Sequence, residues 1–143
     1  MNSEYDFSWV GNGFVFCFLE DCPRREECLR YCAGRQLPED RIVGPAVYPG
    51  ACHNGECSFF RKNEKVRLAT GFGGGAQKHV FLAMRNKLTE YLRGNGEYYK
   101  YRNGKKWLSP EQQAYICDLC RRYGYKDEVT FDCYKEDYDF TCT

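Results

Sequence analysis

The sequence has no long hydrophobic run and very few of the residues that enzymes use most for proton transfer. Its 143 residues include only two histidines, two methionines and two tryptophans. No run approaches the roughly 18 apolar residues of a membrane-spanning helix, so we expect no membrane partner. The opening residues, MNSEYDFSWVGNGFVF, are acidic where a secretory signal is basic, which predicts a cytoplasmic location.

Aromatic side chains and cysteines are abundant instead. The chain has 12 tyrosines, 10 phenylalanines and 10 cysteines, and 43% of its residues are hydrophobic. This content suffices for a core and excludes an intrinsically disordered chain, while the length is that of one domain. We therefore expect a single compact α+β domain over residues 1–143, with a Cys-rich portion over 1–60 and a helix-strand-helix-strand portion over 61–143.

Turn residues and hydrophobic spacing predict two main helices and short antiparallel strands. One main helix is expected over 76–92, where apolar residues recur every four positions. The other is expected from Ser109, which a proline and then Gln112 follow, to about Gly124. The remaining expected elements are a helix over 23–33, a hairpin of strands 7–10 and 14–18 around Gly11–Gly13, a turn over 52–57 at Asn54-Gly55, and strands over 41–48, 97–102 and 129–134.

Charge is segregated along the chain, although the net charge is only +1. Residues 1–60 carry five arginines and nine acids, residues 61–106 carry twelve basic residues and three acids, and residues 107–143 carry four basic residues and eight acids. A basic middle between acidic flanks indicates either a binding face or charges that neutralise one another within the fold.

Six of the ten cysteines lie within 41 residues, as two Cys-x4-Cys loops and a pair one helical turn apart. They are Cys17, Cys22, Cys28, Cys32, Cys52 and Cys57. A reducing cytosol keeps thiols available to metals, and any four of these six would make a tetrahedral site, for which zinc is the first expectation. His53 is an alternative ligand and an iron–sulfur cluster an alternative occupant. Buried free thiols, or disulfides, are the alternatives without a metal.

A resemblance to a known family is carried by the stretch Cys17-Phe-Leu-Glu-Asp-Cys22-Pro-Arg-Arg-Glu-Glu-Cys28-Leu-Arg30. It resembles the opening of a family of small uncharacterised bacterial proteins, a domain of unknown function. The similarity continues at Cys57–Arg61, Lys65–Arg67, Tyr98–Arg102, Leu108–Ile116 and Phe131–Tyr134. The resemblance implies that Cys17, Cys22, Cys28 and Cys57 occupy the family's cysteine positions, so this set is our first choice of metal ligands. The alternates are Cys52, Cys32 and His53.

The four later cysteines depart from that family pattern. Cys117 and Cys120 have Cys-x-x-Cys spacing, but they fall inside the last expected helix, on one face beside Ile116. A redox pair needs its nucleophile at a helix N-terminus, where the dipole lowers the thiol pKa. Buried packing is therefore the favoured interpretation, and a second metal site with Cys133 and Cys142 is the alternative.

The end of the basic segment is the candidate for contact with nucleic acid. Basic residues alternate with tyrosines on the expected strand over 97–102, and a strand of this kind can contact phosphates and stack on bases. The candidate residues are Tyr99, Lys100, Tyr101, Arg102, Lys105 and Lys106. The alternative is that the acidic flanks neutralise this segment and the tyrosines pack. The glycines of 71–75 precede a helix but lack the Gly-Lys-Ser/Thr of a phosphate loop, and favour a connector.

The sequence contains no recognisable catalytic constellation. The two histidines are His53 and His79, and the side chains of the neighbours Cys52 and His53 would diverge. We therefore expect a non-enzymatic cytoplasmic bacterial protein with a structural zinc site made of four cysteines. It would act as a module for an unknown protein or nucleic acid, with no small-molecule substrate. The alternatives are an iron–sulfur redox or sensor protein, or a metal-free protein with buried thiols or disulfides.

Overall fold

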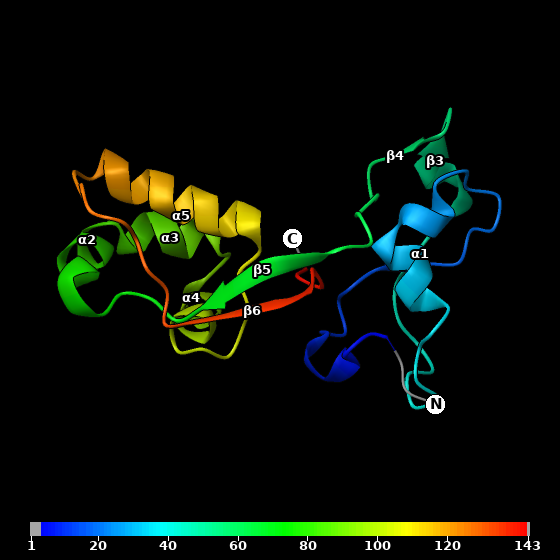
Figure 1. Cartoon of the computed structure of the whole chain (residues 1–143), viewed down its shortest axis with the longest axis horizontal. Helices are drawn as coiled ribbons and strands as arrows, with labels where there is room; N and C mark the ends of the chain where they lie inside the picture. Colours follow the sequence, from blue (N-terminus) through cyan, green and yellow to red (C-terminus); the bar gives the residue numbers. More distant parts are fainter. Residues whose placement is uncertain (1–3, 143) are drawn as a thin grey trace. The chain divides into compact units, whose positions relative to one another are not determined.

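The computed structural model describes residues 4–142 and has a mixed α/β fold, as expected (Figure 1). The chain forms two compact units. Unit 1 is the described residues of Met1–Lys65 and Tyr138–Thr143, and unit 2 is Val66–Asp137. The expected division after residue 60 lies close to the boundary between the units, but the return of the C-terminal residues to unit 1 was not expected. The single-domain organisation stays a prediction.

Regular elements are short in the first half of the chain and longer in the second (Figure 1). The first half contains η1 Phe7–Trp9, β1 Phe16–Cys17, η2 Arg25–Glu27, α1 Leu29–Gly34, β2 Ala46–Val47, η3 Pro49–Ala51, β3 Cys52–His53 and β4 Glu56–Cys57, where η denotes a 3₁₀ helix. The second half contains β5 Lys65–Thr70, η4 Gly75–Gln77, α2 Lys78–Ala83, α3 Arg85–Tyr91, α4 Asn95–Arg102, α5 Pro110–Arg122 and β6 Cys133–Tyr138, and β5 pairs with β6.

The prediction of an N-terminal hairpin around Gly11–Gly13 is wrong. Phe7–Trp9 is the 3₁₀ helix η1, begun by Asp6, which accepts a hydrogen bond from the Ser8 amide. β1 pairs instead with β2, in parallel. The two-residue β2 is what remains of the strand expected over 41–48. The physical reason is aromatic burial: the ring of Phe140 lies 5.8 Å from that of Trp9, so packing with the C-terminal segment overrides local strand pairing.

The helix expected over 23–33 is interrupted at Cys28. This residue is extended (φ −101°, ψ 123°) between η2 and α1. Its neighbours pair with the segment after residue 60: the Leu29 amide donates to the Arg61 carbonyl at 2.6 Å, and the Asn63 amide donates to the Glu27 carbonyl at 2.9 Å. These bridging bonds hold Cys28 out of the helix and fix its direction in unit 1.

The turn expected at Asn54-Gly55 is confirmed. Asn54 (φ 52°) and Gly55 (φ 78°) both have positive φ, as a two-residue hairpin turn requires. They join β3 to β4 in antiparallel pairing that places Cys52 opposite Cys57. The hairpin therefore presents two thiols side by side.

The long helix expected over 76–92 is divided in unit 2 into η4, α2 and α3. The break between α2 and α3 falls at Met84, which has φ −101° and ψ 11°. The four-residue apolar stripe nevertheless stays buried: Val80, Met84, Leu88 and Leu92 all belong to the main hydrophobic cluster of unit 2. Periodicity predicted the buried face correctly and the continuity of the helix incorrectly.

The strand expected over 97–102 is also wrong, because this segment is helix α4. Gly94, with φ 128°, immediately precedes it, and the Tyr98 amide donates to the Gly94 carbonyl. Tyr98 and Tyr101 are three residues apart on this helix, and both are buried in the same cluster. The burial of two tyrosine rings on one helical face overrides their strand propensity.

The last helix begins as predicted. Ser109 accepts from the Gln112 amide at 3.2 Å, the Gln112 side chain accepts from the Ser109 amide at 2.8 Å, and Pro110 is the first helical residue. The final strand lies four residues later than expected, at Cys133–Tyr138 rather than over 129–134. In the described part of the chain, no helix has the length and apolar character needed to cross a bilayer.

Candidate metal centre

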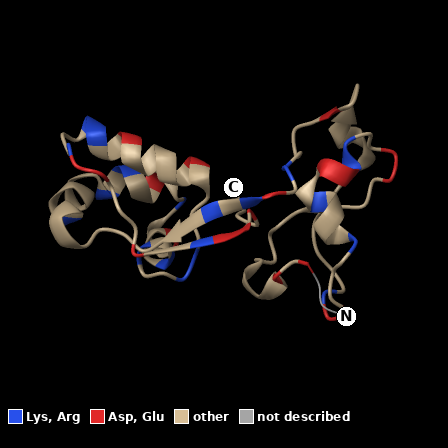
Figure 2. Cartoon of the chain, viewed as in Figure 1, with Lys and Arg blue, Asp and Glu red and all other residues tan. Residues whose placement is uncertain are grey.

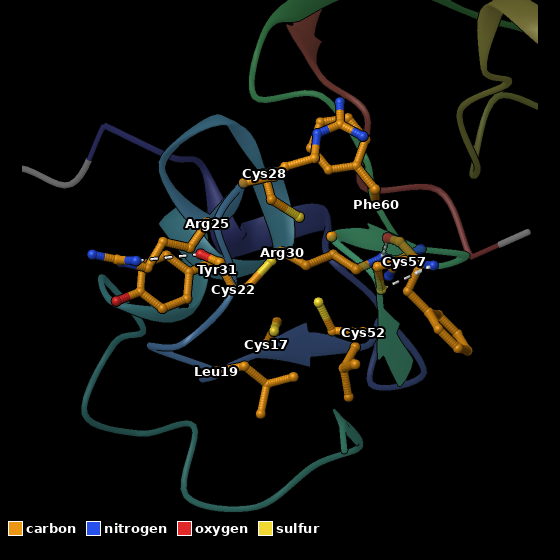
Figure 3. A pocket seen from close by; sticks show the side chains of 14 residues that line it. Cys17, Leu19, Cys22, Arg25, Cys28, Arg30, Tyr31, Cys52, Cys57 and Phe60 are labelled. Atoms are coloured by element: carbon orange, nitrogen blue, oxygen red, sulfur yellow. Dashed lines mark hydrogen bonds between the residues drawn. The ribbon is translucent and has the colours of Figure 1, made fainter. Parts of the chain in front are cut away.

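Five cysteines of unit 1 line one cavity (Figure 3). They are Cys17, Cys22, Cys28, Cys52 and Cys57. The rest of the wall is formed mainly by apolar and aromatic side chains, including Leu19, Tyr31, Val47, Phe59 and Phe60. The cavity volume is about 20 Å³, and a cavity of roughly 10–15 Å³ holds a single water molecule. The space between the thiols therefore has the size of one small ligand or ion.

The local structure positions these thiols from three separate stretches of chain. Cys17 ends β1, and Cys22 follows in a turn in which its amide donates to the Leu19 carbonyl at 3.4 Å. Cys28 occupies the break between η2 and α1. Cys52 and Cys57 face each other across the β3–β4 hairpin. The two Cys-x4-Cys loops of the sequence therefore open on the same cavity.

The thiols are close enough to influence one another. Cys52 is in hydrogen-bond contact with Cys22 and interacts electrostatically with Cys22, Cys57 and Cys17. Two thiolates that share a tetrahedral zinc lie about 3.8 Å apart, because the Zn–S distance is about 2.3 Å. A pair in hydrogen-bond contact is therefore already near the spacing that a shared ion requires.

The surroundings of Cys17 and Cys52 favour the protonated thiol in the absence of an ion. Burial raises the pKa of the Cys17 thiol, which the hydrogen bond from the Leu19 backbone partly offsets. The pKa of Cys52 is raised by burial and then by its contact with Cys22. Each pKa is raised further by neighbouring thiols, because a second negative charge there is unfavourable. A cation that binds to both thiols would displace their protons and remove this repulsion.

Three arginines bring positive charge to the wall of the cavity. The Arg25 guanidinium donates to the Cys22 carbonyl at 3.3 Å, and Arg24 stacks over the Phe60 ring at 3.6 Å. Arg30 is buried and donates to the carbonyls of Phe59 at 2.7 Å and Val15 at 2.8 Å. These bonds are to backbone oxygens, so the arginines leave the thiols unoccupied while offsetting the negative charge of thiolates.

The structure separates the expected ligands into two groups. All four residues of our first choice line the cavity, together with the alternate Cys52. The other two alternates do not line it: the Cys32 thiol donates to the carbonyls of Arg25 and Glu26 at 3.5 and 3.4 Å, and His53 is exposed in the hairpin. The break at Cys28 explains the exclusion of Cys32, because the two residues do not share one helical face.

The five thiols are gathered but not yet closed on one point. Across residues 4–142, no group of three or more His, Cys, Asp or Glu side chains is arranged so that it could hold a metal ion. All ten cysteines are free thiols.

The later cysteines lie elsewhere. Cys120 is fully buried in the core of unit 2, where its Sγ lies 3.8 Å from the Met84 Sδ, and burial raises its pKa to about 11. Burial likewise raises the pKa of Cys117, which packs against the same cluster. Cys133 and Cys142 are exposed. Packing, the favoured interpretation of the Cys-x-x-Cys pair, agrees with this environment.

The residues singled out for nucleic acid lie on α4 and in the turn after it, so they do not form an alternating strand. Tyr101 is only 7% exposed, which leaves its face unavailable for stacking on a base. Glu97 binds Lys100 at 3.4 Å and also binds Lys106. The guanidinium groups of Arg85 and Arg102 lie 5.2 and 5.9 Å from the centroid of the Tyr99 ring.

The remaining candidate of this set, Lys105, is exposed. Acidic residues also lie beside basic ones on the β5–β6 pair (Figure 2). Several residues of the basic segment are therefore engaged within the chain, chiefly with Glu97 of the same segment, and contact with nucleic acid stays a prediction.

Comparison with known families covers almost the whole chain. Residues 1–140 match a family described as a family of unknown function, DUF6078. The chain belongs to this family. No curated protein and no solved structure matches it. Any statement about the function of this member of DUF6078 therefore rests on the arrangement of its own side chains.

Proposed function

We propose that the chain is a non-enzymatic, cytoplasmic binding module in which unit 1 is held together by one zinc ion in a site of four cysteine thiolates. The single observation that supports it is the convergence of both Cys-x4-Cys loops on one cavity. All ten cysteines are free thiols, which agrees with a reducing compartment. The ion would stabilise unit 1 by linking β1, the turn after it and the β3–β4 hairpin.

The ligand set that the contacts favour is Cys17, Cys22, Cys52 and Cys57. It replaces Cys28 of our first choice with Cys52, because Cys52 contacts Cys22 and is paired with Cys57. Figure 3 shows Cys17 and Cys52 on one side of the space and Cys28 on the opposite side in that view. Two short chelating loops are also how structural zinc sites are commonly assembled.

The size of the cavity favours a single ion over an iron–sulfur cluster. A cluster brings several iron and sulfide atoms between its four thiolates, whereas the cavity that these thiols line has a volume of about 20 Å³. Sulfur-only ligation favours zinc among the common cytosolic divalent ions.

A protein partner is the interaction that the surface favours. Ile42 and Val43 of unit 1 are 87% and 92% exposed, and Phe18 and Tyr48 are also more than half exposed. Phe18, Ile42 and Val43 line one hollow of the surface, and a contiguous apolar patch is typical of surfaces that bind proteins. The basic residues of α4, by contrast, already bind Glu97 or stack on tyrosines.

Metal content tests the proposal directly. Protein purified without oxygen should contain one zinc per chain by mass spectrometry, with four thiols protected from alkylation. Cys22→Ser should lose the zinc, whereas the matched control Cys32→Ser, whose thiol lies outside the cavity, should retain it. Iron with broad visible absorbance, or ten reactive thiols and no metal in the wild type, would contradict the proposal.

A further inference from the structure

The β3–β4 hairpin aligns two thiols through its own backbone. Cys52 lies directly opposite Cys57 in the antiparallel pairing, and His53 lies opposite Glu56. Side chains of directly opposed residues project from the same face of such a pair and contact each other. The alignment of the two thiols is therefore a property of local strand pairing, and no ion is needed to explain it.

The place of this pair in the hairpin suits a cross-strand disulfide. In a hairpin with a two-residue turn, the pair that flanks the turn is the hydrogen-bonded one, which is here His53 and Glu56. Hydrogen-bonded and non-hydrogen-bonded pairs alternate along antiparallel strands, so Cys52 and Cys57 are a non-hydrogen-bonded pair. The Cα atoms of such a pair are about 4.5 Å apart, and those of disulfides are roughly 4.4–6.8 Å apart. The strand pairing therefore already gives the backbone spacing that an S–S bond needs.

Both thiols of the hairpin are accessible to a dissolved oxidant. Cys52 and Cys57 are each partly exposed, whereas Cys17 and Cys28 of the same cavity are buried. The Phe59 amide donates a hydrogen bond to the Cys57 Sγ at 3.4 Å, which helps to fix the direction of that sulfur. An oxidant can therefore reach this pair while unit 1 remains folded.

Cys22 is the competing partner, because its side chain is in hydrogen-bond contact with Cys52. Among the described residues, however, no backbone hydrogen bond joins the turn at Cys22 to the hairpin. The contact between Cys22 and Cys52 therefore depends on side-chain orientation, whereas strand pairing holds Cys57 opposite Cys52. Closure of the short loop between Cys52 and Cys57 also costs less chain entropy than closure of the longer one to Cys22.

We propose that Cys52 and Cys57 are a modification site at which a hydroperoxide forms a disulfide across the β3–β4 hairpin. One sulfur attacks the peroxide, whose O–O bond breaks, and becomes a sulfenic acid. The second sulfur then forms the S–S bond and displaces the hydroxyl group. With hydrogen peroxide, the two thiols give up two electrons and two protons, and the peroxide becomes two water molecules.

This inference goes beyond the proposed function and does not require the zinc site. The two are linked, because sulfurs that share a disulfide bond are no longer thiolates, and thiolates are the form that binds zinc. Oxidation of the hairpin would remove Cys52 and Cys57 from the proposed ligand set and so release the ion.

The test treats the reduced full chain with one equivalent of hydrogen peroxide, then blocks free thiols by alkylation and digests the chain with trypsin without a reductant. Cleavage after arginine places both hairpin cysteines in the peptide 42–61 and Cys22 in the peptide 1–24. By mass spectrometry, the peptide 42–61 should be lighter by two hydrogens and carry no alkyl group. A cross-link between the peptides 1–24 and 42–61 would overturn the proposal in favour of Cys22.

The exposed cysteines of the same chain are the internal reference for reactivity. Oxidation of Cys133 and Cys142, which are exposed, while the peptide 42–61 stays reduced would overturn the proposal. Cys57→Ser should abolish the two-hydrogen loss from this peptide, whereas the control Cys32→Ser, whose thiol donates to backbone carbonyls, should preserve it. The peptide mass of the wild type decides the proposal even if a serine at position 57 disturbs folding.

Zinc content measured in the same samples separates this proposal from the proposed function. Release of one zinc per chain in step with the hairpin disulfide would support both. A hairpin disulfide in a wild type that holds no zinc would leave the modification site standing and overturn the zinc site. Bound zinc with no hairpin disulfide after peroxide treatment would do the reverse.

Discussion

The hydrophobic core of unit 2 is one continuous cluster, whereas that of unit 1 is divided into two. In unit 2, one hydrophobic cluster of buried residues runs from Ala69 to Phe131 and includes residues of α2, α3, α4 and α5. In unit 1 the buried residues divide into an aromatic cluster around Phe14 and Phe140 and a small cluster of Cys17, Cys28, Tyr31 and Val47. Two of the four members of this small cluster are thiols of the cavity.

This difference suggests why the cysteines are concentrated in unit 1. Among its described residues the longest helix has six residues and the strands β1 to β4 have two each, so backbone pairing contributes little there. Small folds with limited cores commonly rely on a metal or disulfides. In unit 2 the 13-residue α5 and all but one residue each of β5 and β6 provide regular structure that needs no such link.

The largest expected effect is that of zinc removal, confined to unit 1. A structural zinc contributes folding free energy on the order of 10 kcal/mol. The two tryptophans report on the units separately, because Trp9 lies in unit 1 and Trp107 in unit 2. In Trp107→Phe, chelation should sharply lower the denaturant midpoint read from Trp9. In Trp9→Phe, the midpoint read from Trp107 should stay within error.

Equal shifts for both tryptophans would show that the two units do not differ in their dependence on metal. If neither denaturant midpoint shifts, zinc does not contribute to the stability of the protein.

The reverse experiment weakens the core of unit 2. Leu88 on α3 is fully buried, so Leu88→Ala should cost about 2–5 kcal/mol of unfolding free energy. Its matched control is Leu82→Ala on α2, which is 62% exposed and should change stability by no more than about 0.5 kcal/mol. Denaturation of Trp9→Phe, read from Trp107, measures both, and zinc content should remain one per chain. Similar losses for the two leucines would argue against a core-dependent unit 2.

The sequence could predict an element where local residues determine it, and could not where packing against distant residues does. The turn at Asn54-Gly55 and the capping box from Ser109 to Gln112 are specified by the residues that form them, and both were predicted correctly. Where distant packing decides, prediction failed. Phe7–Trp9 became helical because its rings meet Phe140, and the tyrosines of α4 became helical because they enter the core.

The candidate site was predictable to the same extent. Spacing alone indicated that six cysteines could converge, and five of them line the cavity. The exclusion of Cys32 could not be foreseen, because it depends on the break at Cys28, which bonds from Leu29 to Arg61 impose. The contact between Cys52 and Cys22 brings together two loops some thirty residues apart, which spacing within either loop does not reveal.

The smallest expected effect on stability comes from an ion pair at the surface of unit 2. Glu97 on α4 has a pKa below its ordinary value, chiefly because Lys106 donates a hydrogen bond to it and secondarily through Lys100. A carboxyl with a lowered folded-state pKa stabilises the fold above its unfolded pKa of about 4.3. That stabilisation is lost as the pH falls from there through the folded-state pKa. Because the glutamate side chain is 31% exposed, the effect should stay below about 1 kcal/mol.

Glu97→Gln isolates this contribution. At pH 6 the variant should be less stable than the parent, with Trp107 as the reporter in a Trp9→Phe background, and the difference should shrink toward zero near pH 3 because the parent carboxyl is then protonated. The nearby Glu90→Gln is the matched control, since Glu90 is exposed on the preceding helix, α3. A difference for Glu97→Gln that persists unchanged at low pH would mean that packing of the side chain, rather than its charge beside Lys106, is what unit 2 uses at this position.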